Sequence, residues 1–419
     1  MNRNLTISCV QDKKFKKDLE ALRGLVAIIV VVHHVFVYDF YLDPYFSPER
    51  ILFMDTLGHF AVLIFFVLSG YVIGLSSERL IKWELIKLYL RKRFIRLYPI
   101  YLISLCFALI VSNKTYGLVT IIHNVLFTQV WFDKIIWENN PLWSLHYEVI
   151  FYIIFIPISL FNIKPVLVFF ITIIVSFLSF FYVDYIGFPA LTSYSVGFTF
   201  WSAGFLLSFY SKGQKIDIKY TKLICSIFLL ISLSYFNVMT TIWNKIELFS
   251  FGYQLRHHNV YWPKIMNKLV DFSYLPYAIL ILSWYIGFSL KFKKIIEYFL
   301  LFLPSLTFLY LYRNQHLISY FVIPGFLYIV SILFYFNRSA WVEKVSEMII
   351  NKSVLLGGIS YGIYILHFPL LVLFSRIELF SGTVYSYIGR FVFFVITILF
   401  ISYLAEKKIQ PYVVRYFKN

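Results

Sequence analysis

The chain alternates between long apolar segments and short polar connections. About twelve segments are apolar enough to be candidate membrane-spanning helices, which need roughly 20 residues to cross a hydrocarbon layer about 30 Å thick. They cover residues 21–38, 57–75, 97–112, 143–161, 164–182, 192–210, 219–237, 272–290, 295–312, 316–336, 354–375 and 384–405. The third and ninth are short, so ten or eleven full spans with re-entrant pieces are the alternative. The pattern predicts an all-α fold, a polytopic transmembrane helix bundle of about 10–12 spans.

The composition agrees with this prediction and excludes a soluble domain. Of 419 residues, 60% are hydrophobic and only 14% are charged, whereas about 25% of the residues in an ordinary soluble protein are charged. The apolar runs are long and unbroken, which argues against a β-barrel, whose strands alternate apolar and polar residues. The three cysteines, Cys9, Cys106 and Cys225, form neither a disulfide framework nor a metal-binding motif, so no metal site is expected.

The distribution of basic residues predicts how the helices are oriented. The formal net charge is +17, and the basic residues gather in alternate connections, as they do where cytoplasmic loops carry Lys and Arg. The lysines at positions 13–17, the connection Arg79–Arg96 and the tail Lys407–Lys418 all fall on the inner side. Both termini are therefore predicted to be cytoplasmic. Anchoring against anionic lipid explains this charge better than nucleic acid does, so the bilayer is an expected partner and nucleic acid is not.

The first apolar segment carries two ionisable residues at a suggestive spacing. Arg23 and His34 are eleven positions apart, which on an α-helix corresponds to a rise of about 16 Å and directions about 20° apart. Arg23 is therefore predicted at one membrane surface and His34 near the middle, where ionisable groups usually line a cavity or a reaction path. A neutral imidazole can act as a general base. A structural histidine satisfied by backbone carbonyls is an equally good reading. His33 points about 100° away and is the expected bystander.

Two further stretches suggest where a donor with a phosphate group would bind. Arg93 and Arg96 lie one helical turn apart before Pro99, and forked guanidinium groups suit phosphates. The alternative is that both arginines only anchor the helix at the inner surface. Ser69 and Gly70 are small residues inside an apolar span. They could let a narrow acyl-pantetheine arm approach the backbone, although close helix packing is the commoner reason for such residues.

Glu148 is predicted to share the site with His34. Glu148 lies about five residues into a span that runs inward from the outer side, which corresponds to a depth of about 8 Å below the outer surface. This is close to the depth expected for His34. A carboxylate there could orient the imidazole and stabilise its charged form, and pairing for helix association is the alternative. On the acceptor side, the candidates are Trp143, Ser144, Tyr364 and His367. As a lone histidine past the middle of its span, His367 is more typical of a structural residue.

These segments together resemble the acyltransferase-3 family, integral membrane O-acyltransferases that modify bacterial surface polysaccharides and some small molecules. Six motifs occur in the family's order: LRGLVAIIVVVHH, FFVLSGYVI, RFIRLYPIYL, LWSLHYEVIFY, FWSAGFLL and ISYGIYILHFP. In the resemblance, Arg23 and His34 match the essential R-x10-H pair. The family's other motifs match Arg93 and Arg96, the run that contains Ser69 and Gly70, and the run Trp143–Glu148. Many members end with I-E-x-P, whereas this chain has Gln410 before Pro411.

The resemblance implies an enzyme that moves an acyl group, usually acetyl, from cytoplasmic acyl-CoA to a hydroxyl of a polysaccharide or its lipid-linked precursor. Acetyl-CoA would be a co-substrate and no cofactor would be bound permanently. The implied organisation is a basic cytoplasmic segment at 1–18, the transmembrane domain at 19–411 and a cytoplasmic tail at 412–419, in the bacterial plasma (inner) membrane. Catalysis is assigned to His34, Glu148 and Arg23. The alternative function is a secondary transporter or a lipid-linked glycan flippase without acyl chemistry.

Overall fold

The fold is built from α-helices. The computed structural model describes residues 2–48, 57–76, 82–132, 134–186, 190–214, 216–239, 241–242, 270–288, 293–313 and 318–416, and none of these residues is in a strand. The main helices are α1 (Asn2–Val37), α2 (Leu57–Ser76), α3 (Trp83–Ile110), α4 (Leu118–Val125), α5 (Gln129–Phe132), α6 (Leu142–Leu160), α7 (Pro165–Ile186), α8 (Ala190–Tyr210), α9 (Tyr220–Leu233), α13 (Leu275–Tyr285), α14 (Lys293–Arg313), α15 (Ile318–Phe336), α16 (Ala340–Gly357), α17 (Ser360–Phe374), α18 (Val384–Tyr403) and α19 (Gln410–Tyr416). Short 3-10 and π-helical pieces lie at Trp137–Asn139 and Leu404–Ile409.

Several of these helices are long and apolar enough to cross a membrane. Six qualify within the described residues: Lys17–Val37, Gly58–Ser76, Trp83–Ile110, Leu142–Leu160, Lys293–Arg313 and Val384–Tyr416. A seventh results if Val322–Phe336 and Ala340–Gly357, bent by 115°, count as one broken span. The predicted polytopic helix bundle is confirmed. The full-length spans in the described part are fewer than expected, because some apolar runs form shorter helices such as α9, α13 and α17.

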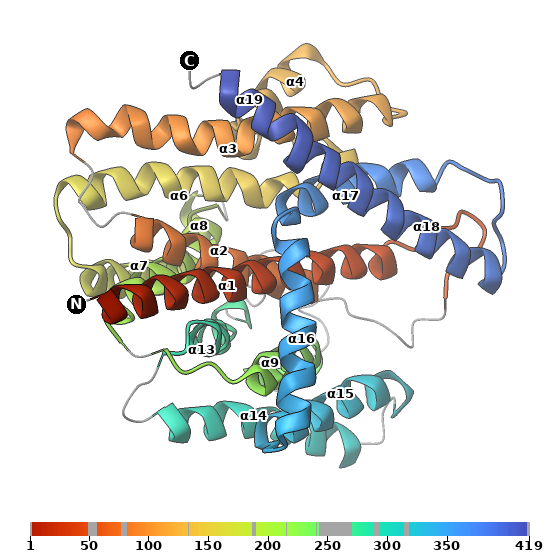
Figure 1. Cartoon of the computed structure of the whole chain (residues 1–419). Helices are drawn as coiled ribbons and strands as arrows, with labels where there is room; N and C mark the ends of the chain where they lie inside the picture. The colour runs from red at the N-terminus through yellow and green to blue at the C-terminus, as the bar shows by residue number, and fades with distance from the viewer. Residues whose placement is uncertain are drawn as a thin grey trace. The chain divides into compact units, whose positions relative to one another are not determined.

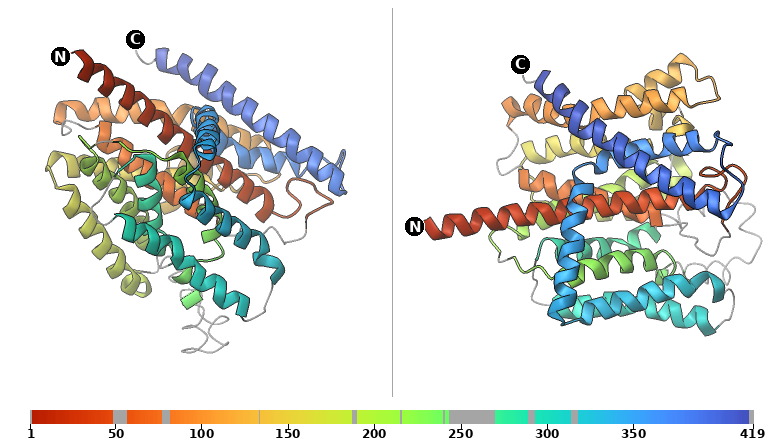
Figure 2. Two further views of the ribbon diagram at one scale, coloured as in Figure 1. Left: turned by 60° about the horizontal axis from the view of Figure 1, so that its bottom comes forward. Right: turned by 45° about the vertical axis from the view of Figure 1, so that its right-hand side comes forward.

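Two predicted connections are helical instead. The basic stretch before residue 97 belongs to α3, so Arg93 and Arg96 lie on the helix itself. The polar stretch between residues 336 and 354 forms most of α16, which bends sharply away from α15 (Figure 2). Both stretches contain long side chains such as Lys, Glu, Leu and Arg, which favour helices whether or not the sequence is apolar. Hydropathy alone therefore underestimated the helical content.

The chain divides into two compact units, each assembled from separate stretches. The first unit comprises Met1–Leu22, His59–Glu78 and Ile163–Ser353, and the second comprises Arg23–Gly58, Arg79–Asn162 and Val354–Asn419. In the second unit α3 runs alongside α6 and α17 (Figure 1). The Tyr89 hydroxyl of α3 donates to the Tyr152 carbonyl of α6 at 3.3 Å, and Tyr361 of α17 donates to the Leu97 carbonyl of α3 at 2.9 Å.

A buried arginine ties the segment that follows α1 to the helices at the end of the chain. The Arg390 side chain of α18 donates to the backbone carbonyls of Leu42 (2.6 Å), Leu379 (2.9 Å) and Phe374. Asp43 accepts from the Gly382 amide at 3.0 Å and from the Ser386 hydroxyl at 2.8 Å. Gly382 has φ +95°, a conformation that glycine adopts without strain. These bonds fix the exit of α1, on which the position of the site described below depends.

The first unit contains a very close helix crossing between α2 and α8. A Cβ atom added to Gly70 would lie 1.8 Å from the carbonyl oxygen of Trp201, and one added to Gly204 would lie 1.8 Å from that of Val67. Only glycine allows the two backbones to approach this closely. Elsewhere in the first unit Glu297 is buried and accepts from the side chains of Lys222, Trp284 and Tyr335 at 2.6–2.7 Å.

Candidate active site

Two histidine side chains from opposite ends of the chain meet in the second unit. His34 of α1 is half-buried and His367 of α17 is fully buried. Nδ1 of His34 lies 3.0 Å from Nε2 of His367, and the ring centroids are 4.9 Å apart. Each ring also faces a backbone carbonyl: Nδ1 of His34 lies 2.9 Å from the Val30 oxygen, and Nδ1 of His367 lies 2.7 Å from the Tyr364 oxygen.

These contacts determine which ring nitrogens carry protons. A carbonyl oxygen only accepts hydrogen bonds, so Nδ1 of His34 and Nδ1 of His367 must both be donors. Nε2 of His367 then carries a lone pair and accepts from Nδ1–H of His34. With its proton on Nδ1, the neutral His34 ring keeps a lone pair on Nε2, which is the form that a general base requires.

An aromatic cluster surrounds His34 at the end of α1. Tyr38 stacks on the His34 ring with centroids 5.7 Å apart, and Phe368 meets the ring edge-on at 5.5 Å. Trp137 packs against Tyr38 and Phe368 and donates from Nε1 to the Tyr41 hydroxyl at 3.2 Å. Because the Trp137 side chain is 42% exposed, this aromatic cluster connects the surface with the surroundings of His34.

The backbone that carries Trp137 is held by a buried carboxylate. Glu138 accepts from the hydroxyls of Ser112 at 2.8 Å and Tyr116 at 2.6 Å, and the Tyr116 oxygen in turn accepts from the Trp137 amide at 3.1 Å. Burial and the hydrogen bond to Glu138 raise the pKa of Tyr116 above its ordinary value. Tyr116 therefore keeps its proton for Glu138 at neutral pH and beyond, and Trp137 has a fixed support.

A stripe of polar residues runs along α6 next to α17. Ser144, Glu148 and Tyr152 follow at intervals of four and so share one face of the helix. The Ser144 hydroxyl is hydrogen-bonded to the Tyr364 hydroxyl at 2.6 Å, one turn before His367. Tyr152 donates its hydroxyl to Glu148. Glu148 also lies within electrostatic range of Tyr361 and Tyr364.

The far end of this stripe is occupied by an arginine from α3. The Arg93 guanidinium lies between the rings of Tyr89 and Tyr152, 5.5 Å from each centroid, in the geometry of cation–π contacts. Arg96, one turn on, is exposed. Gln410 of α19 donates to the backbone carbonyls of Ile95 and Arg96. The Gln410 amide therefore contacts the backbone that carries the two arginines.

The predicted pairing of Glu148 with His34 is not what the structure contains. His34 is hydrogen-bonded to Val30 and His367, and no hydrogen bond within the described residues joins it to Glu148. Depth estimated from helix rise was too coarse to separate neighbouring turns: Ser144 is the α6 residue near His367, and Glu148 lies one turn closer to Arg93. The partner that sequence reasoning missed is His367, which it treated as an acceptor-side candidate or a structural histidine.

The remaining predicted residues are placed as follows. Arg23 lies three turns before His34 on α1, beside Gly24, whose added Cβ would be 2.5 Å from the Gly357 nitrogen. Trp143 packs edge-on against Tyr147. Ser69 and Gly70 belong to the first unit, where the close approach of α2 and α8 gives Gly70 the packing role that was the alternative. Binding of acyl-CoA by these two residues stays a prediction.

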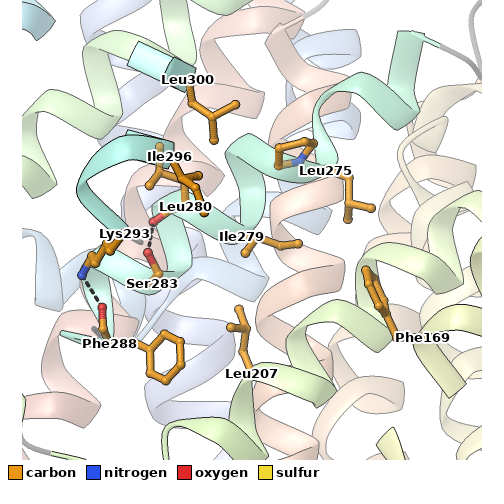
Figure 3. A pocket seen from close by; sticks show the side chains of 11 residues that line it. Phe169, Leu207, Leu275, Ile279, Leu280, Ser283, Phe288, Lys293, Ile296 and Leu300 are labelled. Atoms are coloured by element: carbon orange, nitrogen blue, oxygen red, sulfur yellow. Dashed lines mark hydrogen bonds between the residues drawn. The ribbon is translucent and has the colours of Figure 1, made fainter. Parts of the chain in front are cut away.

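The first unit also has a cavity, and its chemistry differs from that of the histidine pair. It measures about 340 Å³ and is lined by side chains of α7, α8, α13 and α14, with Lys293 near one end (Figure 3). Lys293 donates to the Phe288 carbonyl, and the rest of the lining is apolar apart from Ser283. No imidazole, carboxylate or thiol lines it. Within the described residues no group of His, Cys, Asp or Glu side chains could hold a metal ion.

Comparison with known proteins places these residues in a family context. The family model Acyl_transf_3, described as an acyltransferase domain, matches residues 16–299. A curated relative, Acyltransferase MdmB from Streptomyces mycarofaciens, is 30% identical over 149 residues, which cover 33% of this chain and 38% of the relative. No solved structure matches significantly. The family match includes His34, Arg93 and Glu148 and ends before His367.

Proposed function

Because the chain belongs to the acyltransferase-3 family of membrane acyltransferases, we propose that it transfers an acyl group, acetyl in the first instance, from cytoplasmic acyl-CoA to a hydroxyl of a cell-surface polysaccharide or its lipid-linked precursor. The observation that supports this most is the pair of contacts at Nδ1 of His34, from which its tautomer is inferred. Its Nδ1 proton is held by Val30 and His367, so its Nε2 is the nitrogen available to an acceptor hydroxyl.

The donor is proposed to bind at the end of the polar stripe that carries Arg93 and Arg96. The phosphates of CoA require forked, permanently charged donors, which arginine supplies. Arg93 is held between two tyrosine rings, so little side-chain entropy remains to be lost on binding. From this end the row Tyr152, Glu148 and Ser144 extends by about 12 Å along α6 towards His367.

The reaction is a direct transfer of the acyl group from the sulfur of CoA to the oxygen of the acceptor hydroxyl. His34 Nε2 takes the proton of the acceptor hydroxyl while its oxygen attacks the thioester carbonyl. The new C–O bond forms, the C–S bond breaks, and the CoA thiolate recovers a proton from the His34 imidazolium. The products are an ester and free CoA, and His34 returns to its neutral form. General base catalysis of this kind typically contributes about 10²–10⁴-fold to the rate.

The acceptor is proposed to approach His34 past Trp137 and Tyr41. The exposed indole and the tyrosine hydroxyl to which it is hydrogen-bonded offer both a flat apolar face and polar edges. Such amphipathic rings suit a sugar, which has C–H faces and hydroxyl edges. Trp143, the fourth acceptor-side candidate beside Ser144, Tyr364 and His367, lies on the same helix as Ser144.

The test compares purified full-length protein with its His34→Ala variant, using radiolabelled acetyl-CoA and the lipid-linked glycan fraction of the source membrane. We expect wild type to consume the thioester and to add one acetyl mass to the glycan, and His34→Ala to lose at least 10²-fold in kcat. His123→Ala, in α4 and outside the site, is the matched control. Equal turnover by His34→Ala contradicts the assignment. Movement of the glycan across vesicles without thioester consumption would favour the transporter or flippase.

A further inference from the structure

We propose that His367 is the positioning residue of the acyl-transfer site: its neutral Nε2 accepts the Nδ1 proton of His34 and so directs the basic Nε2 of His34 to the acceptor hydroxyl. This inference rests on the proposed function, because it assigns a role within the same reaction. It is carried by the 3.0 Å contact between the two rings and by the two carbonyl groups that flank them.

The proton arrangement is fixed independently from both ends of the pair. At one end the Val30 carbonyl requires a proton on Nδ1 of His34, and at the other the Tyr364 carbonyl requires a proton on Nδ1 of His367. In the opposite tautomer of His367, its Nδ1 lone pair would face the carbonyl oxygen and its Nε2–H would face the Nδ1–H of His34. Both contacts would then be repulsive. The two rings therefore form a one-way chain of donors and acceptors.

The protein holds His367 too firmly for it to serve as a mobile proton carrier. Its side chain is fully buried. Around it, α17 is fixed to α3 by the hydrogen bond from Ser104 to the Ile365 carbonyl at 2.6 Å, and to α6 by the contact between Ser144 and Tyr364. Phe368 packs against the His34 ring on the next position of α17. A fixed second ring is suited to set the orientation of the first.

The hydrogen bond between His34 and His367 becomes stronger when His34 is protonated during the reaction. Once His34 has taken the acceptor proton, its Nδ1–H becomes part of an imidazolium that points at the lone pair of His367. The hydrogen bond is then charge-assisted and about twice as strong as the neutral one. An interaction that strengthens along the reaction raises kcat rather than binding. His367 thus replaces the carboxylate of a serine-protease-type triad without adding a negative charge to the apolar span.

The experiment uses two substitutions of His367 in the purified full-length protein in lipid nanodiscs. His367→Leu keeps an apolar side chain but removes the acceptor, whereas His367→Gln can place an amide oxygen near the position of Nε2. The assay follows thiol release from acetyl-CoA with octyl β-glucoside as the probe hydroxyl. We expect His367→Leu to lower kcat about 10- to 100-fold, as loss of an orienting partner does elsewhere, with the acetyl-CoA KM unchanged. His367→Gln should recover most of that loss.

Three results would overturn the inference: wild-type kcat in His367→Leu, a change confined to KM, or no recovery in His367→Gln. A spectroscopic measurement decides it even where the leucine variant does not fold. In wild-type protein carrying ¹⁵N-histidine, both rings should show the neutral form protonated at Nδ1, with His367→Gln providing the assignment. A proton on Nε2 of either ring contradicts the inference. Absence of thioester consumption by wild type would instead contradict the proposed function and leave the spectroscopic test valid.

Discussion

Substitution of Glu148 distinguishes two possible roles of its carboxylate, one at the His34 base and one near Arg93. If Glu148 acted on His34, as the sequence suggested, its loss would lower kcat. The structure instead connects Glu148 with Arg93, where the donor is proposed to bind, because Tyr152 donates to Glu148 and the same tyrosine ring packs against the Arg93 guanidinium. We therefore expect Glu148→Ala to weaken acetyl-CoA binding and to leave the chemical step largely intact.

The size of the effect follows from the bond that is lost. A hydrogen bond to a charged acceptor contributes about 1.5–3 kcal/mol, and about 1.4 kcal/mol corresponds to a tenfold change in affinity. Part of the restraint on Tyr152 remains, because its backbone carbonyl still accepts from Tyr89. The lower end of the range, roughly a tenfold increase in the acetyl-CoA Kd, is therefore expected for Glu148→Ala.

The assay is a double-mutant cycle on the acetyl-CoA Kd, measured by equilibrium dialysis with the radiolabelled thioester. Tyr152→Phe keeps the ring beside Arg93 and removes only the hydroxyl, so it should weaken binding to a similar extent. The double variant should bind acetyl-CoA little more weakly than either single variant, because both substitutions remove the same Tyr152–Glu148 hydrogen bond. Tyr210→Phe, at an exposed position of α8, is the conservative control. Additive effects, or a fall in kcat with the Kd unchanged, would refute this reasoning.

Two further predictions concern stability, measured as the apparent unfolding temperature and the fraction that remains monodisperse in detergent. Gly70→Ala should cost about 1–3 kcal/mol of stability, as overpacking does, because its Cβ would lie 1.8 Å from a backbone oxygen. A Cβ at Gly117 would meet nothing within 4 Å, so the control Gly117→Ala should be neutral. Equal stability of the two variants would disprove the packing role of Gly70. Lys222→Met should destabilise the protein by up to about 3 kcal/mol, because it removes the closer cation of buried Glu297, at 2.7 Å, and leaves only Lys293 at 3.9 Å. Adding Glu297→Gln should restore most of the loss. A single variant as stable as wild type would show that this ion pair is dispensable.

The fold class was predictable because it depends on local pattern alone. Long apolar runs can satisfy their backbone in hydrocarbon only as helices, and the structure confirms a polytopic helix bundle. The number of full spans was harder to predict, because α17, which carries His367, is only 15 residues long, although its apolar run suggested a longer helix. The helix α16 was missed for the opposite reason, since its charged residues look like a loop when judged by hydropathy.

The site was predictable only as far as spacing along one helix allows. Arg23 and His34 share α1, and Arg93 and Arg96 share α3, so each pair could be recognised from its own segment. The bond between His34 and His367 joins residues 333 positions apart, and no periodicity connects them. A single sequence therefore identified both histidines and could not reveal that they meet. Helix rise could not resolve neighbouring turns of α6, and a single turn decides which partner Glu148 contacts.

The two rings come from α1 and from α17, so the order of synthesis has a consequence. While the ribosome is still translating the intervening residues, α1 is already present with its imidazole, but α17 has not been made. The unit that surrounds the pair is completed only when the stretch after residue 353 arrives. An unfinished or prematurely terminated polypeptide would thus hold a base without its second ring. Under the proposed function, full acyl-transfer activity would therefore begin only when the whole chain has been made.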